Sequence, residues 1–452
     1  MMRIFTVAVL ALGVSGCTVL GPDYVAPELS GSPTFVGGPN TDLENAATEM
    51  WWEHFKDPIL NSLVNEGFAQ NLDIETAVTR IDAARANAER FGIGQQIDGQ
   101  VSGSYAVGES DDVSFDRSAA QVGAGFVFDI FGATSRAREQ ASAQLDAAQL
   151  DFGTVRLAYV AELVDAYIEL RSAQAAQRIT QQTVRSRNEA ARITRERRAL
   201  DDSTQIEVAR ASSLAAAARA SIPLLQSNER ENAFRIATLL NVPADRILAQ
   251  TSRHHSIPSI KTQITVGVPA NLLRNRPDIR AAERRLAAAT AAVGVSEAAL
   301  YPSLRVDGNV TLSSLDSWSF GPALVFPLTN RPGLIANRRI AEANVKEAEL
   351  GYRSAFNSAV EELQVALSQT EARRKQVREL ISANSSSQAA MNLTMESFNQ
   401  GLITLETVLD AERTRLENSL NLVIGQAELA QSWVRQQVAA GKGWAVSSPT
   451  TN

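Results

Sequence analysis

The chain has 452 residues, a formal net charge of −7 and an aromatic content of 6%. The acidic balance gives no support to a nucleic-acid partner, because proteins that bind nucleic acid carry basic surfaces. Alanine, glutamine, arginine and glutamate are abundant, and this composition favours long helices over a bulky globular core.

Residues 1–16 have the pattern of a secretory signal peptide. Arg3 supplies a positive start, residues 4–14 are apolar, and small residues suited to cleavage follow. The apolar stretch is too short to cross a bilayer as a helix, which needs about 20 residues. We therefore interpret this segment as an export signal.

Cys17 is the only cysteine of the chain and directly follows the expected cleavage site. A lone cysteine cannot form an internal disulfide. The sequence Val14-Ser15-Gly16-Cys17 has the form of a lipobox, so we predict that Cys17 becomes the acylated N-terminus of a bacterial lipoprotein. The alternative is an incidental residue in a removed segment. Residues 17–50, rich in Gly, Pro, Ser and Asn, would then be a lipid-anchored N-terminal extension.

The pattern of the first half predicts short helices, a strand pair and a long helical hairpin, which together form a first repeat, residues 51–242. Asp57-Pro58 and Asn71 are expected to cap two short helices. The period then changes to two, which predicts strands within about residues 97–129. Residues 134–242 predict the hairpin, whose return arm is expected to begin near Asp202-Ser203.

The second half repeats this order at an offset of about 200 residues, which indicates an internal duplication. A second strand pair is expected at about residues 303–327 and a second long hairpin at about residues 332–440, within a repeat that covers residues 269–440. Between the repeats, residues 243–268 lose helical periodicity and are expected to form an equatorial segment outside the helices. Residues 441–452 predict a flexible C-terminal tail.

The strand runs alternate between apolar and polar side chains, and each is close to the length of a tilted transmembrane strand. Such alternation is typical of the wall of a water-filled membrane barrel, but an ordinary antiparallel sheet with one wet face has the same pattern. Four strands cannot close a barrel, because the smallest membrane barrels use about eight. If these strands lie in lipid, several chains must share one barrel, and three chains of four strands would supply twelve.

Other chemistry finds little support in the sequence. His54, His254 and His255 lie outside any HExxH motif, and one cysteine cannot form a thiolate zinc cluster. We interpret the histidine pair as a solvated loop, and Met391 and Met395, four residues apart on a helix, as packing residues. No GxSxG, P-loop or GxGxxG motif is present, so we expect no enzyme, no metal site and no cofactor.

Several short motifs follow one another along the chain: Gly21-Pro22-Asp23-Tyr24, Trp51-Trp52, Phe128-Asp129-Ile130-Phe131-Gly132, Asn275-Arg276-Pro277-Asp278, Tyr301-Pro302-Ser303-Leu304, and Gly401 followed by Val408-Leu409-Asp410-Ala411-Glu412-Arg413. In this order and at these intervals they resemble the outer membrane factor (TolC-like) family. The match is closer to its lipoprotein branch, the efflux channels of tripartite RND multidrug pumps.

The resemblance implies a mixed α and transmembrane β fold. Three copies would form a 12-stranded β-barrel that crosses the bacterial outer membrane and continues into an α-helical barrel in the periplasm. The implied function is passive export of drugs and other small toxic solutes. An inner-membrane RND transporter would deliver them through a periplasmic adaptor protein. The only bound group expected is the covalent lipid on Cys17.

Two alternatives to small-molecule efflux remain. One is an outer membrane channel of type I protein secretion, an alternative that the lipobox disfavours. The other is a periplasmic coiled-coil adaptor lipoprotein that forms no pore. An adaptor would need a lipoyl-like β domain and only one hairpin, so the repeated strand pair and hairpin disfavour it.

The resemblance also implies a periplasmic gate at the hairpin tips, where the matching positions are Asp410 and Arg413. Three carboxylates around a narrow pore would repel one another and attract cations, and arginines would bridge them between chains. The alternative is an ordinary surface pair three residues apart on one helix. In the first repeat the counterpart of Asp410 is Arg210, so opposite charges are able to link the two hairpins.

Two departures from the family pattern affect this gate. Glu406 stands where relatives tend to place an apolar side chain, four residues before the aspartate. It adds a second acidic ring or weakens the apolar constriction. In the first hairpin, Asp201-Asp202 stand where a tip glycine is usual.

Overall fold

In the computed structural model of the protein, the described residues are 19–27, 43–91, 96–110, 113–253, 255–260, 275–313 and 316–445. Cys17, the signal segment and most of the C-terminal tail lie outside this set, as do His254 and residues 261–268 of the predicted equatorial segment. The chain divides into two compact units, each made of three chain segments. Unit 1 consists of Met1–Ser32, Ala77–Phe152 and Pro277–Asn357, and unit 2 of Pro33–Thr76, Gly153–Arg276 and Ser358–Asn452.

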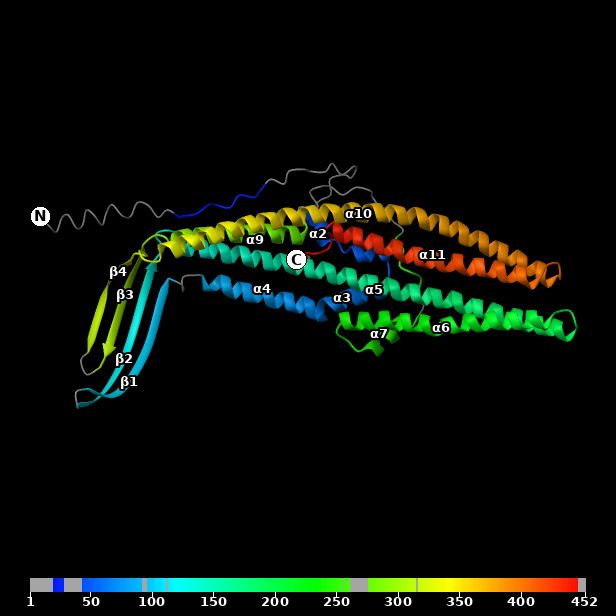
Figure 1. The fold of residues 1–452 in the computed structure, drawn as a ribbon, viewed down its shortest axis with the longest axis horizontal. Coiled ribbons are helices and arrows are strands. Elements are labelled where there is room, and N and C mark those ends of the chain that lie inside the picture. The colour runs from blue at the N-terminus through cyan, green and yellow to red at the C-terminus, as the bar shows by residue number, and fades with distance from the viewer. Residues whose placement is uncertain are drawn as a thin grey trace, which may run out of the picture. The chain divides into compact units, whose positions relative to one another are not determined.

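Unit 1 contains a four-stranded antiparallel sheet in the order β1-β2-β3-β4, with the strands side by side in chain order (Figure 1). The strands are β1 (Ile97–Ser110), β2 (Val113–Phe128), β3 (Ser303–Leu312) and β4 (Ser317–Val325). The β2–β3 ladder joins the two repeats into one sheet. Backbone pairing in the first pair runs from Ile97 opposite Phe126 to Ser110 opposite Val113, within the predicted range of about residues 97–129.

The register aligns the apolar residues of all four strands on one face. Residues directly opposite each other in a ladder point to the same side of the sheet. One such row is Val101, Val122, Val310 and Trp318, and the neighbouring row on the opposite face is Gln100, Gly123, Asn309 and Ser319. The alternation in each strand therefore combines into one apolar and one polar surface.

Helices complete unit 1. They are the larger part of α4 (Leu72–Arg90), the whole of α9 (Pro277–Ala298), and the N-terminal parts of α5 (Ala133–Ala199) and α10 (Arg331–Asn399). Helix α9 begins with proline, whose missing N–H is one that the first turn leaves unpaired. Many of its residues are small and buried, so neighbouring backbones approach closely.

Unit 2 is helical. It contains α2 (Leu43–Thr48), the 3-10 helix η1 (Trp51–Phe55), α3 (Pro58–Gln70), α6 (Gln205–Leu239), α7 (Ala244–Thr251), α11 (Leu405–Ala439) and the remainders of α4, α5 and α10. Corresponding arms of the two long hairpins are nearly equal in length. The outgoing arms have 67 and 69 residues, and the return arms have 35 each. These lengths express the duplication directly in the fold.

Aromatic side chains form one core of unit 2. Trp51 and Trp52 are 0% and 1% exposed, and Trp51 meets Trp433 edge to face at 5.9 Å between ring centroids. Nearby, Asp57 caps α3 by accepting hydrogen bonds from the backbone N–H groups of Ile59 and Leu60. The other carboxylate oxygen accepts a hydrogen bond from the Tyr167 hydroxyl at 2.7 Å. The short helices are thereby fixed to α5.

The turns of both helical hairpins contain a residue in the left-handed backbone conformation. Gly401 has a φ of 75° at the second turn, and Asp201 has a φ of 59° at the first. Aspartate tolerates this region better than most residues, which explains how the first turn forms without the usual glycine. The return arm begins with Thr204 as its N-cap. The expected cap at Asp202-Ser203 was therefore wrong, because the turn uses these residues before the helix begins.

Candidate channel wall and hairpin-tip charges

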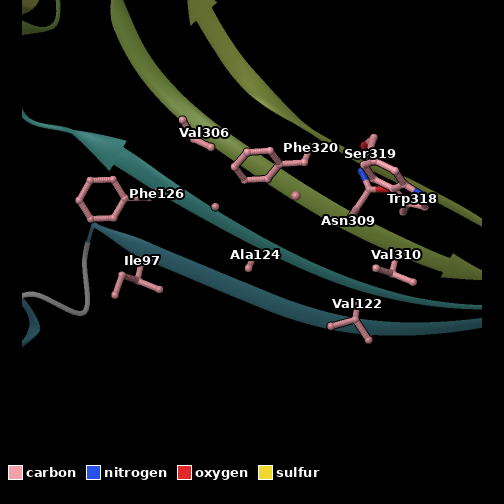
Figure 2. A pocket seen from close by; sticks show the side chains of 12 residues that line it. Ile97, Val122, Ala124, Phe126, Val306, Asn309, Val310, Trp318, Ser319 and Phe320 are labelled. Atoms are coloured by element: carbon pink, nitrogen blue, oxygen red, sulfur yellow. The ribbon is translucent and has the colours of Figure 1, made fainter.

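The apolar face of the sheet is open over a wide area. A shallow hollow of about 690 Å³ lies over it, and Figure 2 shows its side chains, which come from all four strands. Trp318 and Phe320 are 78% and 75% exposed. Exposed apolar patches of this kind mark contact with a membrane or another protein. The hollow is lined mainly by Ile97, Val122, Ala124, Phe126, Val306, Val310, Trp318 and Phe320.

The opposite face carries polar and charged side chains around a smaller hollow of about 300 Å³. Arg305 donates to Asp307 at 2.7 Å from its Nε atom, and its Nη2 atom lies 3.8 Å from an oxygen of Asp98. Gly125 leaves room for these groups, since a β-carbon there would lie 2.7 Å from the Asp307 carboxylate. One face of the sheet thus suits contact with lipid and the other suits contact with water, as in the wall of an aqueous membrane barrel.

The two outer strands, β1 and β4, each pair with a neighbour on one side only within the described sheet. Unpaired strand edges are not stable in lipid, where water cannot satisfy the backbone N–H and C=O groups. A sheet that faces lipid must therefore continue into further strands at both edges.

At the hairpin ends of unit 2, the four long helices pack around a small apolar cluster. The Arg197 guanidinium stacks 4.5 Å from the centre of the Phe398 ring and donates to the Phe398 carbonyl at 3.2 Å. The two hairpins are therefore in direct contact close to their turns. The buried members of the cluster are Ala190, Ala191, Ala211, Met391, Phe398, Leu405, Val408 and Leu409.

A buried ion pair ties the hairpins together beside this cluster. Arg187 of α5 donates to Glu412 of α11 at 2.9 Å, with side-chain exposures of 12% and 3%. Arg187 also donates to the Leu214 carbonyl of α6 at 3.1 Å. The other Glu412 oxygen has no hydrogen-bond partner among the described residues. Three of the four arms thus meet at one guanidinium.

The sequence did not single out Arg187 and Glu412. Charged residues on a helix are normally solvated, and only contact with the other hairpin buries these two. One sequence signal was available, because Glu412 lies four residues after Val408 and three before Arg415, on the face that packs inward. Arg415 is also buried and donates to Thr183 at 3.1 Å.

The predicted gate residues lie on the exposed surface of the hairpins. Arg413 donates to Asp410 at 2.7 Å within α11, with side-chain exposures of 67% and 65%. Arg210 of α6 reaches Glu406 of α11 at 3.3 Å. Opposite charges do link the two hairpins, but the partner of Arg210 is Glu406 and its sequence counterpart Asp410 pairs within its own helix. Both pairs are exposed, so each adds little stability within one chain.

The two return arms differ in how they begin. In α6 the Thr204 hydroxyl accepts from the backbone N–H of Glu207, and the Glu207 carboxylate accepts from the Thr204 backbone N–H. That hydrogen bond lowers the pKa of Glu207. In α11 the corresponding Thr404 side chain makes no cap hydrogen bond. Its hydroxyl lies 3.2 Å from the Thr407 hydroxyl instead, and Thr407 stands where the first hairpin has its capping glutamate. The second hairpin thus lacks a cap that the first one has.

One carboxyl group in unit 2 has an unusual environment. Burial raises the pKa of Asp165 on α5 to about 6, against the opposing effect of Arg435, and the neighbouring Glu169 raises it further. One of its oxygens has no hydrogen-bond partner within the described structure. The carboxylate form of Asp165 is therefore poorly stabilised in the folded chain.

Other candidate chemistry is not supported by the described residues. They contain no cluster of three or more His, Cys, Asp or Glu side chains suited to a metal ion, and none of their helices is long and apolar enough to span a membrane. His54 forms a hydrogen bond with the Trp51 carbonyl at 3.0 Å. Met391 belongs to the buried cluster and Met395 packs against it, so these two methionines are packing residues.

Comparison with known proteins agrees with this geometry. Residues 63–242 and 268–442 match the family described as outer membrane efflux protein. The chain is 32% identical over 456 residues to Nodulation protein T of Rhizobium leguminosarum bv. trifolii, with 97% of each chain covered. It is 30% identical over 432 residues to the pyoverdine export outer membrane protein OpmQ of Pseudomonas putida, with 89% of this chain and 90% of the relative covered.

Solved structures show the same fold. The outer-membrane channel OprN superposes with a TM-score of 0.82 at 29% identity, over 94% of this chain and 99% of that one. The Campylobacter jejuni outer membrane channel CmeC, at 21% identity, has a TM-score of 0.83 over 94% of this chain and 95% of the other. The fold is therefore that of the TolC-like outer membrane channels, as the sequence predicted.

A two-faced sheet joined to long helical hairpins defines a channel subunit rather than an enzyme. The chain belongs to the outer membrane efflux protein family. The expectations of an outer membrane location, an efflux role and no enzymatic activity are confirmed.

Proposed function

We propose that this protein is the outer membrane duct of a tripartite efflux system. Three copies form a 12-stranded barrel in the outer membrane and a helical barrel in the periplasm, and Cys17 carries the lipid anchor. An inner-membrane RND transporter supplies small toxic solutes, including drugs, through a periplasmic adaptor. The duct itself is passive.

The two-faced sheet with two open edges carries this proposal. Its apolar face suits lipid and its polar face suits a water-filled lumen. Four strands are too few to close a barrel, whereas three copies supply twelve. The edges that need partners, β1 and β4, are different from each other, so copies join head to tail, and such contacts form a ring when the rotation closes.

The names of the relatives favour small molecules as cargo. Besides the pyoverdine export protein, the chain is 29% identical to the toluene efflux pump outer membrane protein TtgI of Pseudomonas putida over 97% of its length. It is 26% identical to the cation efflux system protein CusC of Escherichia coli over 96%. These cargoes differ in charge and polarity, which is consistent with a duct whose selectivity lies in the transporter that feeds it.

The gate is proposed at the hairpin tips. In a trimer, Glu406 and Asp410 would each occur three times around the axis. Rings of acidic side chains make a pore selective for cations. Arg210 and Arg413 offset this charge within each chain. The missing cap on α11 supports the second hairpin as the easier one to move.

The test is a comparison of oligomeric state and conductance. We expect native mass spectrometry of outer membrane extracts to give a trimer, and planar bilayers to show small, poorly conducting channels. Replacing both Asp410 and Arg413 with alanine should raise the conductance, whereas the exposed pair Arg192 and Glu196, replaced in the same way, should leave it unchanged. A monomer that forms no channel would refute the duct, and unchanged conductance in the first variant would refute the gate.

The solutes can be identified in cells. Deletion of the gene should sensitise the bacterium to drugs, solvents or metals, and restoring the gene should reverse the effect. Loss of a secreted protein with unchanged sensitivity to small solutes would favour protein secretion instead.

A further inference from the structure

A groove lies in unit 1 where the sheet meets the helices. It has a volume of about 330 Å³, which is within the range of roughly 300–1,000 Å³ typical of pockets for small ligands. Its apolar walls come from the end of β2 and the residues after it, the last turn of α9 and the residues after it, and the end of β4 and the residues after it. They include Val127, Ile130, Phe131, Tyr301, Val325 and Pro327.

The walls of this groove are exposed in the single chain. Phe131 and Tyr301 stack at 4.9 Å between ring centroids with 30° between their planes, and Tyr301 and Val325 are 41% and 53% exposed. The carboxylate of Asp129 is already occupied, since it accepts hydrogen bonds from the backbone N–H groups of Thr134 and Ser135 at 2.9 and 2.8 Å. The groove therefore offers apolar surface without a free charge to bind a polar ligand.

The described part of the N-terminal extension begins beside the groove. The Leu20 backbone N–H donates to the carbonyl of Phe131, a groove residue, at 3.2 Å. Val19 packs on Gly132, where an added β-carbon would lie 2.7 Å from the valine side chain. Gly132 has a φ of 79°, so this turn favours glycine for both its conformation and its lack of a side chain.

Arg136 holds the extension in this position. Its side chain is 5% exposed and donates to the carbonyls of Leu20 and Gly21 at 3.0 and 3.1 Å and to Asp23 at 2.8 Å. Gly21 lies against Gly294 of α9, where a β-carbon on Gly21 would come within 2.4 Å of the Gly294 backbone. A buried guanidinium and a glycine–glycine contact thus fix the point from which the chain runs toward Cys17.

We propose that this groove seats an acyl chain of the lipid carried by Cys17. Cys17 precedes Val19 by two residues, a span of at most about 7 Å, so its lipid starts within reach of the groove. The groove lies at the end of the proposed membrane strands, at the level where a lipid anchor enters the bilayer. Arg136 acts as a positioning residue that sets where the anchor begins. This inference depends on the proposed lipidation of Cys17.

Photo-crosslinking tests the proposal. Cells are grown with a fatty acid that carries a diazirine, irradiated, and the purified protein is digested for mass spectrometry. We expect crosslinks from the N-terminal lipopeptide to concentrate on residues 295–303 and 325–327. Crosslinks spread over Val101, Val122 and Val310 on the open face of the sheet would instead mean that the chain lies in bulk lipid, and would overturn the seat.

Two matched pairs of variants sharpen the test. Ala299→Phe fills the groove at an exposed position and should lower the crosslink yield several-fold, whereas Ala124→Phe on the apolar sheet face should not. Arg136→Ala should lower and scatter the crosslinks, whereas Arg138→Ala, whose guanidinium contacts Phe91 instead, should leave them in place. Equal yields in Ala299→Phe and the parent chain would overturn the proposal.

The remaining outcomes separate this inference from the proposed function. An N-terminal peptide without lipid overturns both the anchor and its seat. A Cys17→Ser variant, exported with a cleavable signal, carries no lipid of its own. If free phospholipid crosslinks to its groove as strongly as the attached lipid does in the parent chain, the seat is also overturned. Channel conductance is recorded on the same samples, so a protein that fails to conduct but shows the crosslinks refutes the duct and supports the seat.

Discussion

Replacing Asp165 with asparagine should stabilise the protein at neutral pH. Burial raises the pKa of Asp165 to about 6, from an ordinary value of 3.8. Because the folded chain holds this proton more tightly than the unfolded chain, the free energy of unfolding falls as pH rises from about 4 to about 6, and the penalty is complete above that range. The difference corresponds to at most about 3 kcal/mol, since one pKa unit equals about 1.4 kcal/mol.

The assay is thermal unfolding of the purified protein in detergent at a series of pH values. We expect Asp165→Asn to melt at a higher temperature than the parent chain at pH 7.5, with the difference shrinking toward pH 4. Glu347→Gln, which removes one negative charge from an exposed position on α10, is the control and should show no such trend. A difference that is independent of pH, or a less stable asparagine variant at pH 7.5, would refute the assignment of the raised pKa to this residue.

Further substitutions address the helical hairpins. Glu412→Ala leaves Arg187 buried without its carboxylate and should reduce the free energy of unfolding by about 3–5 kcal/mol, a loss measurable by denaturant titration and partly relieved when Arg187 is also replaced by methionine. Gly401→Ala places a β-carbon in the left-handed region and should cost about 1–2 kcal/mol, whereas Asp201→Gly at the matching turn should cost little, as thermal melts of the two variants can show. Thr407→Glu should complete the missing cap on α11, add about 1 kcal/mol to the local stability, and slow hydrogen exchange over the first turn of that helix; unchanged exchange would contradict this.

The fold was largely predictable from the sequence because it depends on two periods. Period two in the strands assigned Val122 and Val310 to the apolar face, and the ladders then placed both in one row. The duplication made each element of one half evidence for its counterpart in the other. Strand ends were less predictable, since the backbone ladder of β1 continues from Val107 to Ser110 after the apolar alternation has stopped.

The charges at the hairpin tips were only partly predictable. Sequence could show that Arg210 faces an acidic helix, but which acid it meets depends on how far one helix is shifted along the other. That shift, fixed by packing around Phe398, brings Glu406 into reach. The same packing buries Glu412, whose type alone predicts a solvated surface. The lipid anchor at Cys17 and the gate remain predictions.

The pairing of β2 with β3 has a consequence for how such a barrel assembles. A wall built from six equal strand pairs would need six seams between separate molecules, each formed at the expense of translational freedom. In this chain β2 and β3 belong to the same molecule, so every second seam forms within one chain. A proposed ring of three copies therefore has only three seams that separate molecules must form. Because every copy contains both strand pairs, β1–β2 and β3–β4, one pair is able to change in sequence while the other keeps its pairing in the ring.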